Sequence, residues 1–201
     1  MEMSDTRKAE LRRTIREQFR YIPDADKKAW DAMLCERVCT MPIVRAARCI
    51  YAYASLPNEA GTWGIMERLL LEGHRLALPR VEGHTMEFYW VESLSELSEG
   101  SFHIMEPVPG QQNSGLDSPV RYARKRAAEP DALMLIPGMA FTEDGLRLGK
   151  GGGFYDRFLS SEPRHRKIAL AYPFQVVKML PLEEHDIKMD LVVTPDRFYP
   201  I

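Results

Sequence analysis

The most apolar short run in the chain, Ala132-Leu133-Met134-Leu135-Ile136, places the strongest limit on the fold. A strand with one face in water alternates apolar and polar residues, whereas this run is apolar at every position. That pattern is typical of a strand buried on both faces, as in a parallel sheet that helices cover on both sides. The run therefore predicts an α/β protein with a mainly parallel central sheet.

Other short apolar runs alternate with helical patterns. We expect further strands at residues 49–54, 76–78 (closed by Pro79), 86–91, 168–171 and 191–194. Apolar spacing predicts a first helix through Leu11, Ile15, Phe19 and Ile22, and a second, after a cap at Asp24 or Asp26, through Trp30, Met33, Leu34 and Val38. A third helix is predicted between a cap at Thr62 and Gly73, through Trp63, Met66, Leu69 and Leu70. A fourth helix is predicted over residues 154–161. This alternation predicts a three-layer sandwich, and 201 residues fit a single domain over 1–201.

Charge and composition exclude several classes of protein. The net charge of −2 gives no basic excess, so we expect neither a nucleic-acid partner nor a membrane partner. No window approaches the roughly 18 apolar residues of a membrane span, and the charged N-terminus is unlike a secretory signal. A basic run before the 132–136 strand is interpreted as a solvated face; it comprises Arg121, Arg124, Lys125 and Arg126.

Cysteine usage indicates the compartment. The three cysteines, Cys35, Cys39 and Cys49, form no disulfide or zinc framework, which favours reduced thiols in a cytoplasmic protein. Cys35 and Cys39 are four residues apart on one helix face, and we interpret them as core packing. Residues 107–119 are rich in Pro, Gly, Gln, Asn and Ser and are predicted to form a long surface loop.

The segment that carries the chemistry runs from Arg147 to Asp156 and reads Arg-Leu-Gly-Lys-Gly-Gly-Gly-Phe-Tyr-Asp. Its glycines leave backbone amides unobstructed and allow the positive φ angles of a concave anion-binding nest. The following helix would add its N-terminal amides and the positive end of its dipole. Arg147 and Lys150 supply cationic donors for phosphate, and Asp156 would hold a bridging Mg²⁺. The segment therefore predicts a site for MgATP.

Other interpretations of these residues stay open at this point. A flexible turn with surface charges has the same composition as a phosphate loop. The segment is not a Walker A loop, because Gly145 and Gly149 are one residue too close and Gly151 stands where Ser or Thr is required. It also lacks the GxGxxG spacing of a Rossmann turn. Lys8 and Arg12, one helical turn apart, could form a solvated face.

The longer string is more specific than its glycines. Residues 137–141 read Pro-Gly-Met-Ala-Phe, and residues 145–157 read Gly-Leu-Arg-Leu-Gly-Lys-Gly-Gly-Gly-Phe-Tyr-Asp-Arg. This string resembles the 5-formyltetrahydrofolate cyclo-ligase family, also called methenyltetrahydrofolate synthetases. The resemblance covers nearly the full chain, with further matches at Lys8, Leu11, Arg12, Tyr53, Ser55, Glu59, 78–81, Met86, Phe88, Gly100, Glu106, Pro107, Leu180, Pro181, His185, Asp186, Asp190 and Thr194.

The resemblance implies an activity, its ligands and a fold. Members of this family convert 5-formyltetrahydrofolate and ATP into 5,10-methenyltetrahydrofolate, ADP and phosphate, with Mg²⁺. Their α/β sandwich looks like the sugar-isomerase and CoA-transferase folds. For this chain we expect a monomer with a reduced folate as its substrate.

The resemblance also assigns roles to residues of this sequence. It implies that ATP contacts Lys8, Arg12, Arg147, Leu148, Gly149, Lys150, Gly151, Gly152, Gly153, Phe154 and Tyr155. It implies that the folate faces Ala54, Glu59, Gly151, Gly152, Gly153, Phe154 and Tyr155. Asp156 and Asp186 would serve Mg²⁺. Lys150, Arg147 and Tyr155 would carry catalysis, because phosphoryl transfer depends on positioning and charge neutralisation.

One departure from the family pattern bears on the substrate. The family usually follows its Glu with Val-Asp-Thr, whereas Glu59 is followed by Ala60, Gly61 and Thr62, so an acid is missing at Gly61. This change favours one alternative, a folate or nucleotide binder without catalysis. A second alternative is a sugar-phosphate isomerase or CoA-transferase-type enzyme on a similar fold, since fold does not fix function. Taken alone, Asp186 could also be a helix cap.

Overall fold

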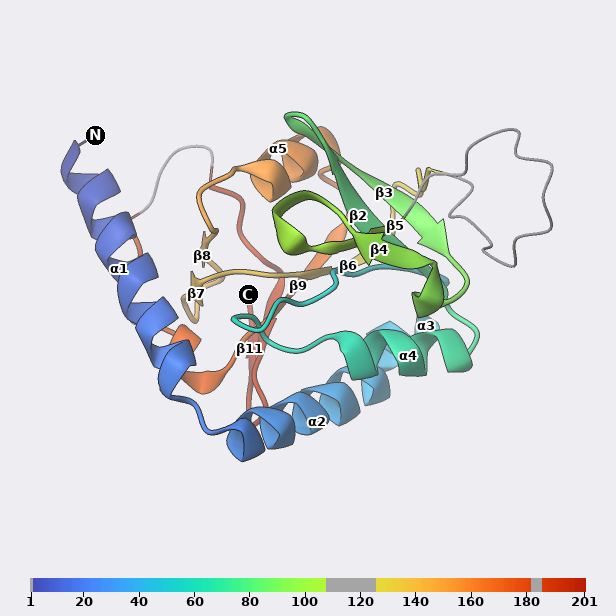
Figure 1. Cartoon of the computed structure of the whole chain (residues 1–201), viewed down its shortest axis with the longest axis horizontal. Coiled ribbons are helices and arrows are strands. Elements are labelled where there is room, and N and C mark those ends of the chain that lie inside the picture. The colour runs from blue at the N-terminus through green and yellow to red at the C-terminus, as the bar shows by residue number, and fades with distance from the viewer. Residues whose placement is uncertain (1, 108–125, 182–185) are drawn as a thin grey trace.

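The computed structural model of the chain describes residues 2–107, 126–181 and 186–201, and its centre is a seven-stranded sheet. The strands are Cys49–Tyr51 (β1), Arg75–Glu82 (β2), Thr85–Val91 (β3), Leu133–Ile136 (β6), Arg166–Leu170 (β9), Leu191–Val193 (β10) and Phe198–Pro200 (β11). Their order across the sheet is β11-β10-β9-β6-β1-β2-β3 (Figure 1). The strands from β10 to β2 run parallel, and the edge strands β11 and β3 are antiparallel to their neighbours.

Strand β6 lies in the middle of the sheet, as its apolar run predicts. Successive side chains of a strand point to opposite faces. Leu133 and Leu135 therefore join one hydrophobic cluster, whereas Met134 and Ile136 join a second cluster on the other face. Both faces of β6 are buried, which explains why no polar residue interrupts the run.

Helices cover both faces of this sheet. The helices are Glu2–Tyr21 (α1), Asp24–Thr40 (α2), Pro42–Ala46 (α3), Trp63–Leu71 (α4) and Phe154–Ser161 (α5). Leu34 of α2 and Met66 of α4 belong to the first cluster, and Leu159 of α5 belongs to the second. In Figure 1, α2 and α4 lie below the sheet and α5 lies above it. The three-layer α/β prediction is confirmed, while the likeness to sugar-isomerase and CoA-transferase folds and the single domain over 1–201 stay predictions.

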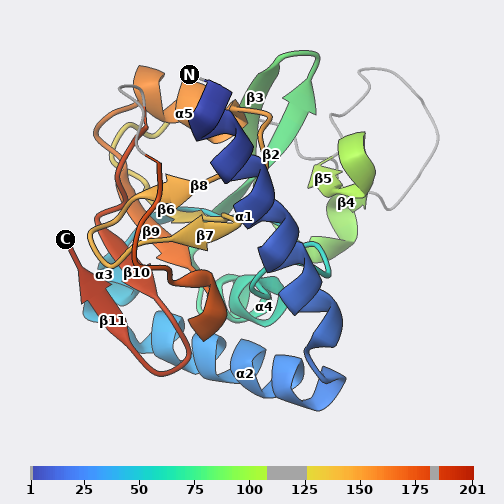
Figure 2. The same cartoon turned by 90° about the vertical axis from the view of Figure 1, so that its left-hand side faces the viewer.

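Helix α1 packs against a separate hairpin. This hairpin consists of Ala140–Phe141 (β7) and Arg147–Leu148 (β8), and it precedes the glycine-rich segment. Ile15 of α1 is buried in a third cluster with Ala140 and Leu148. Figure 2 shows α1 crossing in front of β7 and β8. The N-terminal helix is thereby held beside the residues that the sequence assigns to nucleotide binding.

Two strand predictions need correction. Strand β2 does not end at Pro79 but continues to Glu82, paired with β3. Its other neighbour, β1, is paired only as far as Ala77, so Pro79 lies where that side of β2 needs no ladder donor. Strand β1 is shorter than the predicted 49–54 and ends at Tyr51. Two further strands, Leu97–Glu99 (β4) and Met105–Pro107 (β5), pair with each other and have no counterpart in the predictions.

Two helix details also need correction. The N-cap of α2 is Pro23, and neither Asp24 nor Asp26 acts as the cap, although both acids lie in the first turn, where they favour the positive end of the dipole. Met33 does not face the core and is 47% exposed. It lies beside the inward stripe of α2, which carries the buried Leu34.

The remaining structural predictions divide between described and undescribed residues. Cys35, Cys39 and Cys49 are free thiols. Residues 108–125, which hold most of the predicted surface loop and most of the basic run, lie outside the described residues, as does His185. Arg126 is described and pairs with Glu87 (N–O 2.6 Å). Across residues 2–107, 126–181 and 186–201, no helix is long and apolar enough to cross a membrane.

Candidate active site

The glycine loop, residues 149–153, joins β8 to α5 and gives the site its backbone. Gly153 is the N-cap of α5 with φ 65°, and Gly151 has φ 107°, so both positions need a residue without a Cβ. A Cβ at Gly153 would also lie 2.7 Å from the terminal Nη1 of Arg157, whose side chain would have to move. Helix α5 begins at Phe154, as predicted, and its first amides open toward the loop. The loop and the start of α5 thus have the backbone shape that the sequence predicts, and their role in binding an anion stays a prediction.

Arg147 and Asp156 hold the base of the glycine loop. The Nη2 atom of Arg147 lies 2.5 Å from Oδ1 of Asp156, and its Nη1 donates to the carbonyl of Pro137 (3.3 Å). Only 4% of the Arg147 side chain is exposed. Asp156 lies in the first turn of α5, as the sequence predicts. The described contacts of Arg147 thus join the strand before the glycine loop to the helix after it.

Two basic residues of helix α1 that the sequence singles out, Lys8 and Arg12, contact segments beside the site. Nε of Arg12 donates to the carbonyl of Gly149 (2.8 Å). Nζ of Lys8 pairs with Oδ2 of Asp186 (3.5 Å), and the side chains of both residues are largely buried. Lys8 and Arg12 are therefore not a solvated face. They join α1 to the glycine loop and to the C-terminal segment that carries Asp186.

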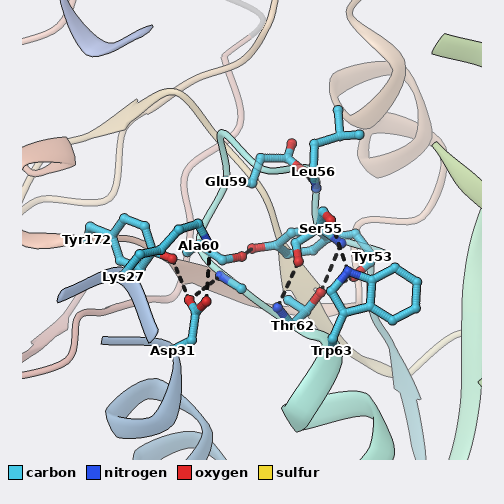
Figure 3. A network of polar contacts seen from close by, with 11 residues as sticks. Lys27, Asp31, Tyr53, Ser55, Leu56, Glu59, Ala60, Thr62, Trp63 and Tyr172 are labelled. Carbon is cyan, nitrogen blue, oxygen red and sulfur yellow. Dashed lines mark hydrogen bonds and ion pairs between the residues drawn. The ribbon is translucent and has the colours of Figure 1, made fainter. Parts of the chain in front are cut away.

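A second loop, residues 55–62, follows β1 and carries Glu59; we call it the Glu59 loop (Figure 3). It is closed by its own hydrogen bonds. The amide of Leu56 donates to Oε2 of Glu59 (2.8 Å), and the hydroxyl of Tyr53 donates to the carbonyl of Ala60 (3.0 Å). Thr62 stands at the predicted N-cap position of α4, but its side chain does not cap the helix, because its hydroxyl donates to the carbonyl of Tyr53.

The two loops meet through one ion pair. Nζ of Lys150 lies 2.7 Å from Oε1 of Glu59. The Glu59 side chain is 8% exposed and that of Lys150 is 39% exposed, so the pair stands at the border between protein and solvent. The sequence assigns these residues separately, to folate and to nucleotide, and does not predict their contact. Their pairing places a cationic group between the two halves of the site.

A cavity of about 320 Å³ lies between the two loops and the β2–β3 hairpin. Most predicted site residues line it: Ala54, Glu59, Arg147, Gly149, Lys150, Gly152, Gly153, Phe154, Tyr155 and Asp156. The predicted residues that do not line it are Lys8, Arg12, Leu148, Gly151 and Asp186. The Leu148 side chain is buried against α1, so Leu148 could meet a ligand only through its backbone. The structure thus separates the cavity from an adjoining basic stretch on α1.

Burial controls the ionisation of the tyrosines at this cavity. Loss of hydration raises the pKa of Tyr155, and the charge of Glu59 raises it further. Burial likewise raises the pKa of Tyr53 well above its usual value of 10.0. Both hydroxyls therefore stay protonated at neutral pH and can donate but cannot act as bases. Among the described residues, Oη of Tyr155 is buried and has no hydrogen-bond partner.

Sequence reasoning missed several residues around the site. Phe102 and Ile104, just before β5, and Glu106, within β5, line the cavity. Burial raises the pKa of Glu106, whose Oε1 accepts the amide of Val81 at 3.3 Å. The Glu106-Pro107 motif was a signal for this residue, but it gave no role. No local signal marks Asp31, which contacts the Glu59 loop from α2.

The carboxylates offer a limited set of metal ligands. In the described ranges, no group of three or more His, Cys, Asp or Glu side chains could hold a metal ion. Asp156 pairs with Arg147, and Asp186 pairs with Lys8. Mg²⁺ is commonly bound by one or two carboxylates together with substrate phosphates and water, so the oxygen donors present fit this metal only as part of a nucleotide complex.

Comparison with known proteins identifies the family. A model of the 5-formyltetrahydrofolate cyclo-ligase family matches residues 4–195. The chain belongs to this family. Curated cyclo-ligases agree along their length: that of Escherichia coli K12 is 29% identical over 92% of this chain and 98% of its own. The mouse cyclo-ligase is 26% identical and covers 92% of each chain.

Solved structures of methenyltetrahydrofolate synthetases share the fold of this cyclo-ligase family member. The synthetase of Aquifex aeolicus superimposes with a TM-score of 0.79 at 29% identity, over 96% of this chain and 92% of that one. The Mycoplasma pneumoniae synthetase gives a TM-score of 0.69 at 23% identity and supports the fold alone. The family resemblance inferred from the glycine-rich string is therefore confirmed.

Proposed function

We propose that this chain catalyses the ATP- and Mg²⁺-dependent cyclisation of 5-formyltetrahydrofolate to 5,10-methenyltetrahydrofolate, with release of ADP and phosphate. The observation that carries the proposal is the contact between the two loops: the cation of Lys150, on a phosphate-binding type of loop, meets Glu59 at the mouth of one cavity. Membership of the cyclo-ligase family supports it.

The nucleotide would bind at the glycine loop. Loop amides and the positive end of α5 suit the phosphates, and Lys150 is exposed enough to reach them. Arg12 lies on the loop through Gly149 and would contact the nucleotide from α1, together with Lys8. Arg147 would act mainly through the loop, because the described contacts of its Nη atoms are with Asp156 and Pro137.

The folate would occupy the cavity beyond the glycine loop. Its walls combine apolar and aromatic side chains with few polar groups, which suits a flat ring system; the apolar lining includes Pro79, Val81, Met86, Phe102, Ile104 and Phe154. Glu59 and the buried Tyr53 and Tyr155 supply the polar groups on the side of Lys150. This arrangement would direct the formyl group toward the phosphate-binding loop.

The chemistry asks the protein for positioning and for neutralisation of charge. The formyl oxygen would attack the γ-phosphorus of ATP, and ADP would leave. The N10 nitrogen would then attack the activated carbon, the carbon–oxygen bond would break, and phosphate would depart as N10 loses its proton. Lys150 and the loop amides would stabilise the charge on the transferred phosphoryl group. No covalent nucleophile is needed, and Tyr155, which stays protonated, would serve as a donor.

Magnesium would neutralise charge on the phosphates when MgATP binds. Asp156, in the first turn of α5, and Asp186, beside Lys8, are the carboxylates proposed to hold it. The cytoplasmic location and the monomeric state remain predictions from the sequence.

An absorbance assay tests the proposal. Purified protein with 5-formyltetrahydrofolate, ATP and Mg²⁺ is expected to form methenyltetrahydrofolate, and omission of ATP or addition of EDTA is expected to abolish the signal. Absence of product with folate binding intact would overturn the enzymatic proposal and favour a folate-binding protein. Product formation without ATP would contradict the proposed chemistry.

A further inference from the structure

Gly61, in the Glu59 loop, lies directly against a carboxylate from another element. Its amide donates to Oδ1 of Asp31, on α2, at 2.9 Å. A Cβ placed on Gly61 would lie 2.4 Å from Cγ of Asp31 and 2.5 Å or less from both carboxylate oxygens. The backbone of Gly61 is not in the left-handed region, so its φ does not demand glycine. The Asp31 carboxylate occupies the space that a side chain at position 61 would fill.

The Asp31 carboxylate is held from several sides (Figure 3). Nζ of Lys27, one helical turn earlier on α2, lies 3.0 Å from Oδ2. The hydroxyl of Tyr172 donates to Oδ1. Tyr172 follows β9, and its ring is buried in the main core cluster. Asp31 therefore connects the Glu59 loop to two parts of the rigid scaffold, α2 and the segment after β9.

The contact acts close to the site. Gly61 is two residues from Glu59, whose carboxylate pairs with Lys150, and it follows Ala60, whose carbonyl accepts the hydroxyl of Tyr53. Within the loop, Ser55 and Thr62 bond to each other in both directions, through the amide of each and the side-chain oxygen of the other (3.1 and 3.0 Å). These internal bonds fix the shape of the loop, and the contact with Asp31 fixes its place relative to α2.

We propose that Asp31 is a positioning residue that supplies, from α2, the carboxylate that this chain lacks at position 61, and that it thereby holds Glu59 in place for the folate. The inference rests on the proposed function, since its readout is folate binding and turnover. Under this proposal, Asp31 takes the place of the acid that is missing at position 61. The glycine at position 61 then does not indicate a loss of catalysis.

A reciprocal exchange tests the proposal. Gly61→Asp alone would crowd two carboxylates into one space, and Asp31→Ala alone would leave the Gly61 amide without this acceptor. Each single variant is expected to raise KM for 5-formyltetrahydrofolate about tenfold, with a smaller change in kcat and in KM for ATP. The double variant Asp31→Ala/Gly61→Asp is expected to recover KM to within about threefold of the wild type. A double variant no better than the worse single variant would overturn the proposal.

Controls separate positioning from stability. Asp26→Ala removes an exposed carboxylate from the same helix and should leave both KM values unchanged. Asp31→Asn keeps an acceptor for the Gly61 amide and can replace Asp31→Ala if that variant does not fold. If Asp31→Asn has the same KM for 5-formyltetrahydrofolate as the wild type, the proposal that a carboxylate charge is needed at this place is overturned. Calorimetric binding of 5-formyltetrahydrofolate without ATP gives the same comparison independently of turnover. A wild type that binds folate without turning it over contradicts the proposed function alone, whereas unchanged folate affinity in Asp31→Ala contradicts the inference.

Discussion

Replacing Tyr155 by phenylalanine is expected to make the unligated protein more stable and the enzyme poorer. The Tyr155 hydroxyl is buried and has no hydrogen-bond partner among the described residues. Such a hydroxyl costs about 1–3 kcal/mol, because it has lost its hydrogen bonds to water and gained none. The substitution removes that cost and keeps the ring, which lies 5.7 Å from the Arg147 guanidinium.

The magnitude follows from the size of the domain. A gain of about 1–3 kcal/mol, which is the cost removed, corresponds to a rise in Tm of about 2–12 °C for a chain of this length. Turnover should move in the opposite direction, because the protonated hydroxyl is the donor proposed to meet the ligands. Loss of one hydrogen bond to a charged group lowers kcat/KM by about tenfold to a hundredfold.

Tyr53 offers a matched control in the same cavity. Its hydroxyl is also buried, but it donates to the carbonyl of Ala60 at 3.0 Å. Tyr53→Phe should therefore lower the free energy of unfolding by about 1 kcal/mol. Thermal unfolding of both variants, followed by circular dichroism without ligands, compares the two signs directly. A fall in Tm for Tyr155→Phe as large as that for Tyr53→Phe would show that the Tyr155 hydroxyl has a partner, and the reasoning would be wrong.

Three further predictions concern charge. Lys150→Ala should lower kcat by about 100-fold, with a change in the free energy of unfolding below about 1 kcal/mol because the ion pair of Lys150 is partly exposed. Lys178→Ala, at an exposed position, is the control, and full activity of Lys150→Ala would refute the assigned role. Arg12→Ala should raise KM for ATP about tenfold, because it removes the hydrogen bond from Arg12 to the carbonyl of Gly149. Arg13 is exposed, so Arg13→Ala should leave KM for ATP unchanged. Equal effects of the two substitutions would argue against a specific role for Arg12. Burial lowers the pKa of His165 below its usual 6.5, so the unfolded chain binds the proton more tightly than the folded chain. The contribution of His165 to stability should therefore be full above about pH 6.5 and should fall as the pH drops toward the folded-state pKa. His165→Gln should accordingly show a weaker fall in Tm between pH 7.5 and 5.5 than the wild type.

The sequence predicted the parts of the fold that depend on local pattern. The run at 132–136 became the central strand because an apolar residue at every position requires burial on both faces. The start of α5 at Phe154 followed from the glycines before it. Pro79 was misinterpreted as a strand end, because whether proline breaks a strand depends on the length of the neighbouring β1, which no local pattern reveals.

The candidate site was predicted in the same way, as separate local motifs. Residue types and spacing predict the chemistry of the glycine loop, and the family resemblance assigns Glu59 to the folate, but the contact between the two depends on strand order. Strands β1 and β6 are parallel neighbours, so the segments that follow them leave the sheet at the same edge. This adjacency brings Glu59 to Lys150, and the order of strands in a sheet cannot be deduced from their order in the chain.

The departure at Gly61 shows why a missing motif residue has to be judged in space. In the sequence, glycine at this position removes an acid, and the simplest interpretation is a weakened substrate site. In the structure, the same glycine makes room for Asp31, whose carboxylate would overlap any side chain at position 61. The two residues are 30 positions apart and belong to different elements, so neither position alone reveals the relation. Because the Asp31 carboxylate and an acidic side chain at position 61 would occupy the same space, we expect positions 31 and 61 to change together. A Gly61→Asp variant made alone would therefore test the repulsion between two carboxylates, and not the contribution of an acid at position 61 to folate binding.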